Sequence, residues 1–597
     1  MKIKKIISLI VATTCAASLF SFMPSFAADS PLFFSECENA TLSDGLQVTT
    51  NIYNVPKPGF SGDGFVWMQN GGTLKFTVTV PKTGMYQLST SFMQELSPEG
   101  RLQHLYINNT NKGSFMLPYR TTWSDYDFGF HRLNEGENII EIRAGWGFAY
   151  FDTLTVDFAQ MDPLDVQPIL ADKQATKETQ SLMDYLCDVY GKNTLSGQQE
   201  IYGSGHEGDA EYEFKWLYDL TGEYPAIRGF DYMNYNPIYG WDDGTTERIV
   251  DWVNEKNGIA TVCWHIHVPN DFTTYELGEI LDWQKATYKP NATFDTAKAT
   301  VKGTKEYDYL MLAIEDLAEQ LLILQENNVP VLFRPFHEAE GNGGLLGEGA
   351  WFWWATAGAD EYIKLWKLLY TELTEKYDLH NLIWTYNSYT YDTSPAWYPG
   401  DDFVDIVGFD KYNTVYNRYD GLTNCPNEDA ISTIFYKLVD LTKGKKMVAM
   451  TENDTVPSLE NLTVERAAWS YFCPWYAEYL MDEKYNNADT LKELYQSDYV
   501  LTLDELPDLK TYVSKKTGGS TTETTTEAPT IIYGDLDGSK KVDNADLVRL
   551  SQHLINEVVL TGNNLKAADV ALDGVVDIAD LALLKQYIMG DSIKLGK

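Results

Sequence analysis

The pattern of hydrophobic and polar positions changes character along the chain. From Asp29 to about Phe158, hydrophobic and polar residues alternate in short runs such as 72–80 and 85–90, which are separated by turn sequences such as Pro81-Lys82-Thr83-Gly84. Closely spaced alternating runs with no helical stretch between them are typical of a β-sandwich. We therefore expect an N-terminal β-sandwich over residues 29–160.

From about Gln180 to Val513, apolar runs alternate with helix-like stretches such as 312–325 and 359–376. This alternation is typical of a parallel sheet covered by helices. Eight runs qualify as strands, the last of them weakly marked: 194–198, 226–232, 259–265, 329–336, 382–387, 404–409, 447–451 and 470–475. They predict an α/β fold, a (β/α)₈ TIM barrel over residues 179–513. Residues 161–178 carry two prolines and little apolar periodicity, so we expect a linker there.

The C-terminal part has a different composition. Residues 514–530 are rich in Thr, Gly, Ser and Glu and have no sizeable apolar side chain to bury, which predicts a flexible linker. Residues 531–597 contain two acidic loops, and each leads into a helix with an apolar stripe, 547–554 and 581–588. We therefore expect a small α-helical domain with paired calcium loops.

The first acidic loop has oxygen-bearing side chains at positions 1, 3, 5, 9 and 12, with glycine between the third and the fifth, which is the calcium-loop arrangement. The predicted ligands are Asp535, Asp537, Ser539, Asp543 and Asp546, with the backbone carbonyl of Lys541. The second loop repeats the pattern with Asp569, Asp573, Asp577 and Asp580, but Ala571 stands at position 3. The missing ligand leaves the occupancy of the second loop open.

The N-terminus has the pattern of an export signal. Three lysines, at positions 2, 4 and 5, precede the apolar run 6–22, and small residues follow at 25–28. This pattern predicts a secretory signal peptide over residues 1–28. A membrane anchor is the alternative, but the run is short and no other apolar stretch is long enough to span a bilayer. We expect a secreted, extracellular protein.

Composition narrows the classes of partner. The formal net charge of −40 argues against nucleic acid or an anionic membrane, since both require a basic surface. The cysteines that remain after the signal peptide are odd in number and widely spaced, which predicts buried thiols rather than a disulfide framework: Cys37, Cys187, Cys263, Cys425 and Cys473. The 16 Trp and 39 Tyr suit the apolar faces of sugar rings, although aromatic residues also fill cores.

Two of the predicted barrel strands end in a carboxylate. Glu338 follows the apolar run that begins at Val329, and Glu452 ends the run 445–452. Barrel enzymes carry their catalytic residues at the C-terminal ends of the strands. A glycosidic bond is cleaved by two carboxyl groups, of which one protonates the leaving oxygen and, in a retaining enzyme, the other attacks the anomeric carbon. A single strand-end glutamate could be a salt-bridged rim residue, but two at these strands favour catalysis.

Four motifs resemble glycoside hydrolase family 26: Arg334-Pro335-Phe336-His337-Glu338, Trp351-Phe352-Trp353-Trp354, the segment 398–410, and Thr451-Glu452. That family consists mainly of endo-β-1,4-mannanases, and the resemblance covers most of residues 180–513. It implies that Glu338 is the acid/base and Glu452 the nucleophile, with no cofactor for catalysis and a monomeric catalytic domain. It also implies a set of sugar-binding residues: His265, Arg334, His337, Trp351, Asp410, Tyr412 and Trp475.

Some residues near these motifs have open or structural roles. The segment 343–350 before Trp351 is longer than is common in the family, which leaves the role of this tryptophan open. His267 is either a second imidazole near His265 or a solvent-facing residue. We expect Trp353, Trp354 and Trp366 to pack against helices.

The N-terminal segment resembles carbohydrate-binding module family 35 in three places: Glu36-Cys37-Glu38-Asn39-Ala40, residues 59–66 and residues 145–152. The resemblance implies a structural calcium site near Glu36, Glu38 and Asp152. Calcium prefers several hard oxygen ligands that converge from separate strands. Trp146 is either a platform for a sugar ligand or an aromatic residue of the sandwich core.

The C-terminal tandem resembles a dockerin, the module that binds a secreted enzyme to the cohesin of a scaffolding protein. Together the resemblances imply a retaining endo-β-1,4-mannanase of the cellulosome that degrades mannan, galactomannan and glucomannan. Two alternatives remain open. The barrel could belong to a xylanase or a mixed-linkage β-glucanase, because fold and carboxylates do not determine the sugar. The chain could also be a non-catalytic component that binds polysaccharide.

Overall fold

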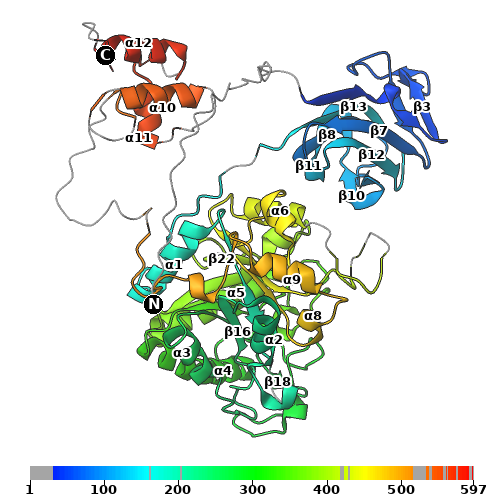
Figure 1. Cartoon of the computed structure of the whole chain (residues 1–597). Helices are drawn as coiled ribbons and strands as arrows, with labels where there is room; N and C mark the ends of the chain where they lie inside the picture. The colour runs from blue at the N-terminus through cyan, green and yellow to red at the C-terminus, as the bar shows by residue number, and fades with distance from the viewer. Residues whose placement is uncertain are drawn as a thin grey trace, which may run out of the picture. The chain divides into compact units, whose positions relative to one another are not determined.

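The computed structural model describes residues 31–160, 163–201, 205–416, 418, 422–427, 431–514, 516, 533–536, 541–542, 544–554, 560, 562–572, 576–589 and 594–595. The chain forms two compact units, Met1–Gly519 and Ser520–Lys597 (Figure 1). The predicted signal peptide and most of the predicted linker 514–530 lie outside the described residues, as do four predicted calcium ligands: Asp537, Ser539, Asp543 and Asp573.

The N-terminal region of the first unit is a sandwich of two antiparallel sheets, as predicted. One sheet has the order β11 (Arg120–Leu133), β8 (Gly84–Gln94), β13 (Ala149–Phe158), β6 (Phe65–Met68) and β3 (Leu46–Thr49), with β1 (Phe33–Glu36) paired to β13. The other has the order β10 (Thr110–Leu117), β9 (Arg101–Ile107), β12 (Gly136–Ala144), β7 (Thr73–Val80) and β2 (Thr41–Leu42). Alternate side chains such as Phe76, Leu88 and Ile140 form the core, because successive residues of a strand point to opposite faces.

The larger region of the first unit is built on an eight-stranded parallel sheet. Its strands are, in order, β15 (Gly197–Gln199), β16 (Ile227–Asp231), β17 (Ile259–Trp264), β20 (Val331–Pro335), β21 (Leu382–Asn387), β22 (Ile406–Lys411), β23 (Met447–Asn453) and β24 (Phe472–Pro474). A parallel bridge between Leu195 and Tyr471 joins the two ends of the sheet. The predicted TIM barrel is confirmed.

Helices cover the outside of this sheet, and Figure 1 shows α3, α4 and α9 around it. The helices are α1 (Lys177–Val189), α2 (Tyr212–Thr221), α3 (Thr245–Asn254), α4 (Lys305–Glu326), α5 (Ala359–Thr371), α6 (Ser432–Leu441), α7 (Leu459–Thr463), α8 (Glu478–Met481) and α9 (Ala488–Tyr495). The side chain of Thr304 caps α4 by accepting a hydrogen bond from the amide of Tyr307. A π-helical turn, η6 (Glu372–Lys376), extends α5 to the predicted end.

The connection between sandwich and barrel differs from a loose linker. Its described residues, from Pro163 to Thr176, contain no helix or strand. Val166 and Leu170 are nevertheless buried in the barrel core. The carboxylate of Asp172 also lies 2.7 Å from Nδ1 of His380. The connection therefore packs on the barrel through single apolar positions, which give no periodic signal in the sequence.

The second unit contains three helices among its described residues: α10 (Asn544–Leu554), α11 (Gly562–Ala568) and α12 (Ile578–Ile588). They enclose a small core of six buried residues: Leu536, Leu550, Leu560, Ala567, Ala568 and Leu584. The predicted helices 547–554 and 581–588 are confirmed within α10 and α12. The short helix α11 was not expected.

Two chain-wide expectations concern cysteines and membranes. In the described part of the chain no disulfide joins the cysteines, four of which are buried while Cys425 is partly exposed. This agrees with the prediction of buried thiols. Of the helices that the structure describes, none is both long enough and apolar enough to cross a membrane.

Candidate active site

The C-terminal end of β20 makes a sharp turn that carries the proposed acid/base. Phe336 and Glu338 both have left-handed backbone conformations, with φ of 48° and 51°. Such conformations are costly for residues with a Cβ and persist only where the surroundings enforce them. Here Trp354 Nε1 donates to the carbonyl of His337 at 2.9 Å, and the Tyr362 hydroxyl donates to the carbonyl of Phe336 at 3.1 Å. These bonds hold the turn that directs Glu338 toward the strand ends.

Trp354 is buried and holds the turn before Glu338 through its hydrogen bond to the carbonyl of His337. Trp353 and Trp366 are buried as well, so the packing role expected for all three tryptophans is confirmed.

Arg334 joins the ends of four neighbouring strands. Its guanidinium forms an ion pair with Glu452 on β23 and donates to Asp410 Oδ2 on β22 at 2.9 Å and to Asn387 Oδ1 on β21 at 2.8 Å. A register shift after Phe409 places Asp410 opposite Glu452. Irregularities of this kind redirect side chains beside active sites.

The proposed nucleophile is held by two donors. Besides the ion pair with Arg334, Oε2 of Glu452 accepts a hydrogen bond from the Tyr412 hydroxyl at 2.9 Å. Burial alone would lower the pKa of Arg334, but the charges of Asp410 and Glu452 raise it well above its ordinary value. The guanidinium is therefore charged at any relevant pH. A carboxylate that contacts a cation and a hydroxyl is fixed in orientation, as a nucleophile requires.

The proposed acid/base has a contrasting environment. The Tyr389 hydroxyl donates to Oε1 of Glu338 at 3.1 Å. Burial, followed by the charges of Asp410 and Glu452, raises the pKa of Glu338 well above its ordinary value, while Arg334 and the Tyr389 hydrogen bond oppose the shift. The charge of Glu452 alone does not account for this shift, because burial is its largest cause. A carboxylic acid that stays protonated near neutral pH can act as a general acid.

Asp410 is the third carboxyl group of this cluster. Burial raises its pKa to about 7, an effect that Arg334 opposes and Glu452 reinforces. The Thr451 hydroxyl donates to Asp410 Oδ1 at 2.6 Å. Because Glu338 and Asp410 both have raised pKa values and the charge of Asp410 acts on Glu338, the protonation of these two groups is linked.

Two imidazoles and two aromatic rings lie beside the carboxyl groups. His265, just after β17, has its Nε2 3.1 Å from Nε2 of His337. The ring of Trp475 is centred 6.5 Å and that of Tyr288 4.9 Å from the ring of His265. The structure thus brings His265, His337 and Trp475 together, as the sequence interpretation requires.

The structure bears on the roles of His267 and Trp351, which the sequence left open. His267 is buried, and its Nδ1 lies 3.1 Å from the carbonyl of His265, so the solvent-facing alternative is wrong. Trp351 is 36% exposed, with its ring centred 6.0 Å from that of Tyr389, the residue bonded to Glu338. An exposed indole at this place is available to a sugar ring.

Several residues of the site were not found from the sequence. Tyr389 binds the acid/base, Asn387 binds Arg334, Tyr288 contacts His265, and Asp231 binds His265. Asp231 and Asn387 end their strands, so their position was a usable signal. Tyr288 and Tyr389 lie in loops, where spacing does not tell which side chain turns inward.

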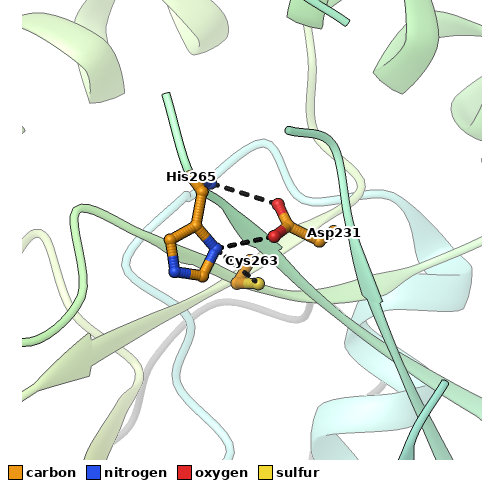
Figure 2. Close-up of side chains that lie close together, drawn as sticks. All are labelled: Asp231, Cys263 and His265. Carbon is orange, nitrogen blue, oxygen red and sulfur yellow. Dashed lines mark hydrogen bonds and ion pairs between the residues drawn. The ribbon is translucent and has the colours of Figure 1, made fainter. Parts of the chain in front are cut away.

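One group near the site has the composition of a metal centre. Asp231, Cys263 and His265 place one ligand atom each within 4.8 Å of one another (Figure 2). His265 Nδ1 and Asp231 Oδ2 are only 2.6 Å apart. A zinc ion about 2.0–2.1 Å from each atom would require a wider separation at a tetrahedral angle. The geometry therefore fits a hydrogen bond between imidazole and carboxylate.

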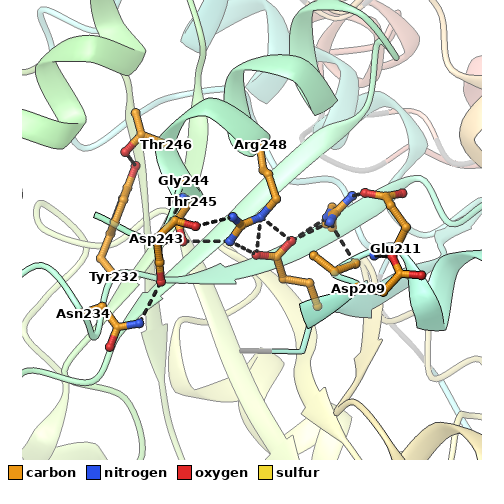
Figure 3. Close-up of polar contacts among 12 residues, drawn as sticks. Asp209, Glu211, Tyr232, Asn234, Asp243, Gly244, Thr245, Thr246 and Arg248 are labelled. Carbon is orange, nitrogen blue, oxygen red and sulfur yellow. Dashed lines mark hydrogen bonds and ion pairs between the residues drawn. The ribbon is translucent and has the colours of Figure 1, made fainter. Parts of the chain in front are cut away.

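A second polar network supports the loops after β15 and β16 (Figure 3). Arg228 Nε and Arg248 Nη2 donate to the buried carboxylate of Glu200, at 2.9 Å and 2.7 Å. Arg248 Nη1 also donates to the carbonyl of Asp243 at 2.7 Å. The network links α3 to the ends of two strands and so fixes the loop that begins after Asp231.

In the sandwich, the three predicted calcium ligands converge. Ser61 bridges two of them: its hydroxyl donates to Glu36 Oε2 at 2.7 Å and its amide to Asp152 Oδ1 at 3.1 Å. The amide of Asp63 donates to Glu38 Oε1 at 2.9 Å, whereas Oε2 of Glu38 is buried without a hydrogen-bond partner among the described residues. Burial raises the pKa of Asp152 to about 6. Converging oxygens with one orphaned acceptor fit a hard cation such as calcium.

Trp146 is 52% exposed. Of the two alternatives left open for this residue, a place in the sandwich core is therefore wrong, and a platform for a ligand is compatible with its position.

In the second unit, each acidic loop closes on its last aspartate. Asp546 Oδ1 accepts a hydrogen bond from the amide of Leu536 at 2.7 Å. Asp580 accepts from the amides of Ala571 at 2.9 Å and Asp577 at 3.0 Å. Both carboxylates are fully buried. Asp535 and Asp569, the first residues of the two loops, and Lys541 are also described, and a calcium ion would balance the buried negative charge.

Comparisons with known proteins agree with this geometry. Residues 171–505 match glycosyl hydrolase family 26, and residues 533–589 match the dockerin type I domain. The mannan endo-1,4-beta-mannosidase of Thermothelomyces thermophilus is 33% identical over 478 residues, which are 79% of this chain and 90% of that protein.

Two crystal structures extend the similarity over both sandwich and barrel. That of a ruminal GH26 endo-beta-1,4-mannanase is 52% identical, with a TM-score of 0.76 over 80% of this chain and 98% of that one. That of the Podospora anserina GH26-CBM35 beta-(1,4)-mannanase is 30% identical, with a TM-score of 0.54 over 80% of this chain and 99% of that one. The chain belongs to glycosyl hydrolase family 26 and carries a dockerin type I domain.

Proposed function

We propose that the protein is a secreted, retaining endo-β-1,4-mannanase that acts as a component of a cellulosome. The observation that carries the proposal is the pair of glutamates at the ends of β20 and β23, one kept protonated by burial and the other held by Arg334 and Tyr412. The similarity to mannan endo-1,4-beta-mannosidases, over most of both chains, supports mannan as the substrate.

The reaction proceeds in two displacements. In the first, Glu452 attacks the anomeric carbon while Glu338 protonates the leaving oxygen, which gives a covalent glycosyl-enzyme. In the second, ionised Glu338 takes a proton from water, which attacks the same carbon and releases Glu452. The nearby Arg334, Asp410 and Tyr412 orient Glu452 through both steps.

The sugar in the −1 subsite is surrounded by aromatic and imidazole groups. His265 contacts both His337 and Trp475, and the three residues would line this subsite together. Trp351 stands near the acid/base, where it offers an aromatic face to the sugar on the leaving side.

The choice of sugar is the main alternative within the enzyme class, because a xylanase or a mixed-linkage β-glucanase would need the same two carboxylates. Products should be analysed on galactomannan, glucomannan, xylan and barley β-glucan. We expect mannan oligosaccharides from the first two substrates only. Hydrolysis of xylan without hydrolysis of mannan would overturn the proposal.

The alternative of a non-catalytic binding component is disfavoured because both glutamates are present and correctly held. It predicts that the protein binds insoluble mannan and releases no reducing sugar. A pull-down combined with a reducing-sugar assay distinguishes the two.

For the N-terminal module, residues 29–160, we propose a family 35-like carbohydrate-binding sandwich with calcium at Glu36, Glu38 and Asp152 and a sugar platform at Trp146. Calorimetry of the full chain should show a transition that chelation lowers and that Glu38→Gln makes insensitive to chelation. An unchanged response to chelator in this variant would count against the site.

For residues 531–597, we propose calcium-dependent binding to a cohesin of a scaffolding protein. Dockerin type I domains generally bind calcium, and the small core here needs that contribution to its folding free energy. Asp535→Ala should weaken binding more than Asp569→Ala, because the second loop already lacks a ligand at Ala571. Calorimetry against a panel of cohesins, with and without chelator, tests both points. Calcium-independent binding would contradict the proposal.

The domain boundaries that go with this organisation are a signal peptide over 1–28, the sandwich over 29–160, a connection over 161–178, the catalytic barrel over 179–513, a linker over 514–530 and the dockerin over 531–597. Limited proteolysis with mass spectrometry should cut first in the region 514–530.

A further inference from the structure

Asp231 has no part in the two displacement steps, yet it binds a residue of the −1 subsite. We propose that Asp231 is a positioning residue whose carboxylate fixes the tautomers of His265 and His337 and thereby sets which hydrogen bonds the two imidazoles can offer to the −1 sugar. This inference deepens the proposed function and rests on it, because it assumes that the two histidines face a sugar.

The contact between Asp231 and His265 is made at two points. Oδ1 accepts a hydrogen bond from the backbone amide of His265 at 3.1 Å, and Oδ2 lies 2.6 Å from Nδ1 of its ring. Asp231 is only 2% exposed. Figure 2 shows the carboxylate between the backbone and the ring of His265. Two bonds to one residue fix both the position of the ring and its rotation.

The charge of Asp231 determines where the protons are. Burial would raise the pKa of Asp231, but its interactions with His265 outweigh burial and lower the pKa, so the carboxylate is ionised. An ionised carboxylate can only accept hydrogen bonds, so Nδ1 of His265 carries a hydrogen. The other nitrogen, Nε2, is an acceptor if the ring carries only this hydrogen, and the contact with His337 shows that it does.

The contact between the two histidines decides the roles of both rings. The Nε2 atoms of His265 and His337 are 3.1 Å apart, and one of them must be the donor. If His265 donated there, neutral His337 would have to carry its hydrogen on Nδ1; we infer instead that His337 donates from Nε2 and that its Nδ1 carries no hydrogen. Consistently, Nδ1 of His337 is buried and has no hydrogen-bond partner among the described residues. A buried N–H group left without an acceptor would be the more costly arrangement.

Burial, together with the charge of Arg334, lowers the pKa of His337 well below its ordinary value, so this imidazole is neutral. The result is one ordered chain in which His337 donates to His265 and His265 donates to Asp231. The direction of these hydrogen bonds is set by the carboxylate of Asp231, which can only accept.

The strand end that carries Asp231 is itself immobilised. The hydroxyls of the next residue, Tyr232, and of Thr246 are 3.2 Å apart, and Asn234 donates to Asp243 Oδ2 at 2.8 Å. Figure 3 shows these contacts beside Arg248. The network around α3 thus holds the strand end that carries Asp231.

The proposal predicts a specific result for Asp231→Asn. An amide can donate to Nδ1 as well as accept from it, so both imidazoles can reverse their tautomers. Loss of the carboxylate partner of the catalytic histidine costs about 10⁴-fold in serine proteases, where that histidine transfers protons. His265 orients sugar and transfers none, so we expect kcat/KM on mannopentaose to fall about tenfold to a hundredfold, the effect of outer-sphere partners on metal-bound histidines. Most of the loss should appear in kcat.

Cys263→Ser is the matched control. Cys263 pairs with Asp231 in the strand register, and its Sγ lies 4.0 Å from the same nitrogen of His265. Activity within twofold of wild type is expected, and incubation with a zinc chelator should not change it. If Cys263→Ser or chelation were as damaging as Asp231→Asn, the three residues would act as a metal site and the proposal would fail.

The tautomers can be read directly. The chain has eight histidines, so the NMR spectrum of ¹⁵N-histidine-labelled protein is simple enough to assign with the variants His265→Gln and His337→Gln. The wild-type enzyme should show hydrogen on Nδ1 of His265 and on Nε2 of His337. The opposite tautomers in the wild type would overturn the proposal, whether or not Asp231→Asn folds.

Failure of this inference can be told from failure of the proposed function. If Glu452→Ala is inactive on mannan while Asp231→Asn keeps full kcat/KM, only the role of Asp231 is wrong. If the wild-type enzyme does not hydrolyse mannan at all, the proposed function itself is wrong.

Discussion

The two glutamates of the candidate active site are nearly equally buried, at 9% exposure for Glu338 and 4% for Glu452, but their partners differ. Glu452 contacts the guanidinium of Arg334 and the hydroxyl of Tyr412. Glu338 contacts one hydroxyl, that of Tyr389, and experiences the negative charges of Asp410 and Glu452. The same side chain is therefore prepared as a nucleophile at one strand end and as an acid at the other, and the neighbours decide which.

The largest effect is expected from Glu452→Ala. Removing the nucleophile should lower kcat on mannan roughly 10⁴-fold or more. With 2,4-dinitrophenyl β-mannobioside, added azide should occupy the vacated side and yield the α-glycosyl azide, because it attacks opposite the leaving group. A β-glycosyl azide from this variant would mean that the two roles are reversed.

Glu338→Ala should be the next most damaging change. Loss of general acid–base catalysis costs about 10²–10⁴-fold on mannan. The dinitrophenyl substrate needs no proton on its leaving group, so its first step should be almost unaffected. Azide should accelerate turnover and give the β-glycosyl azide. An equal loss on both substrates would argue that Glu338 does not protonate the leaving oxygen.

Arg334→Lys tests the nucleophile side without removing the charge. A single ammonium cannot bind Glu452, Asp410 and Asn387 together as the planar guanidinium does. We expect kcat to fall about 10²-fold. Substitution of an exposed arginine, Arg120→Lys on the sandwich, is the control and should change nothing. A similar kcat for the two variants would show that the contact of one guanidinium with all three side chains is unimportant.

The smallest expected effect is a shift in pH dependence, which distinguishes the role of the Tyr389 hydroxyl from that of the Tyr412 hydroxyl. The Tyr389 hydrogen bond stabilises ionised Glu338 and so lowers its pKa against the effect of burial. In Tyr389→Phe the pKa of Glu338 rises, and the alkaline limb of kcat/KM should move upward by about 0.4–1 pH unit, the equivalent of one hydrogen bond. Tyr412→Phe removes the hydroxyl from Glu452 and should leave that limb in place. A downward shift in Tyr389→Phe would contradict the assignment of Glu338 as the acid.

Much of the barrel could be predicted because its strands are buried on both faces and appear as continuous apolar runs. The predicted strand 382–387 has the bounds of β21, and Glu338 and Glu452 were found because they stand where such runs end. The connection around Val166 and Leu170 gave no signal, since single buried positions have no period. Helix α11 was missed because a stretch as short as Gly562–Ala568 has too few turns to show a helical period of apolar residues.

The residues of the site that escaped prediction depend on long-range geometry. Tyr389 is one of several tyrosines after β21, and only the folded chain shows that its hydroxyl, rather than that of Tyr391, reaches Glu338. Asp231 could be recognised as a strand-end carboxylate, but its link to His337 passes through His265, which follows another strand. Local patterns identify candidate chemistry, whereas pairings between strands assign its roles.

The central claim is that Glu452 forms the covalent intermediate and Glu338 does not. It is tested most directly by incubating the enzyme with a 2-deoxy-2-fluoro-β-mannobioside that bears a dinitrophenyl leaving group, followed by digestion and mass spectrometry. The fluorine slows both steps, and the good leaving group lets the glycosyl-enzyme accumulate. The account predicts a single added glycosyl group on the peptide that contains Glu452. A label on Glu338 or Asp410 would contradict it.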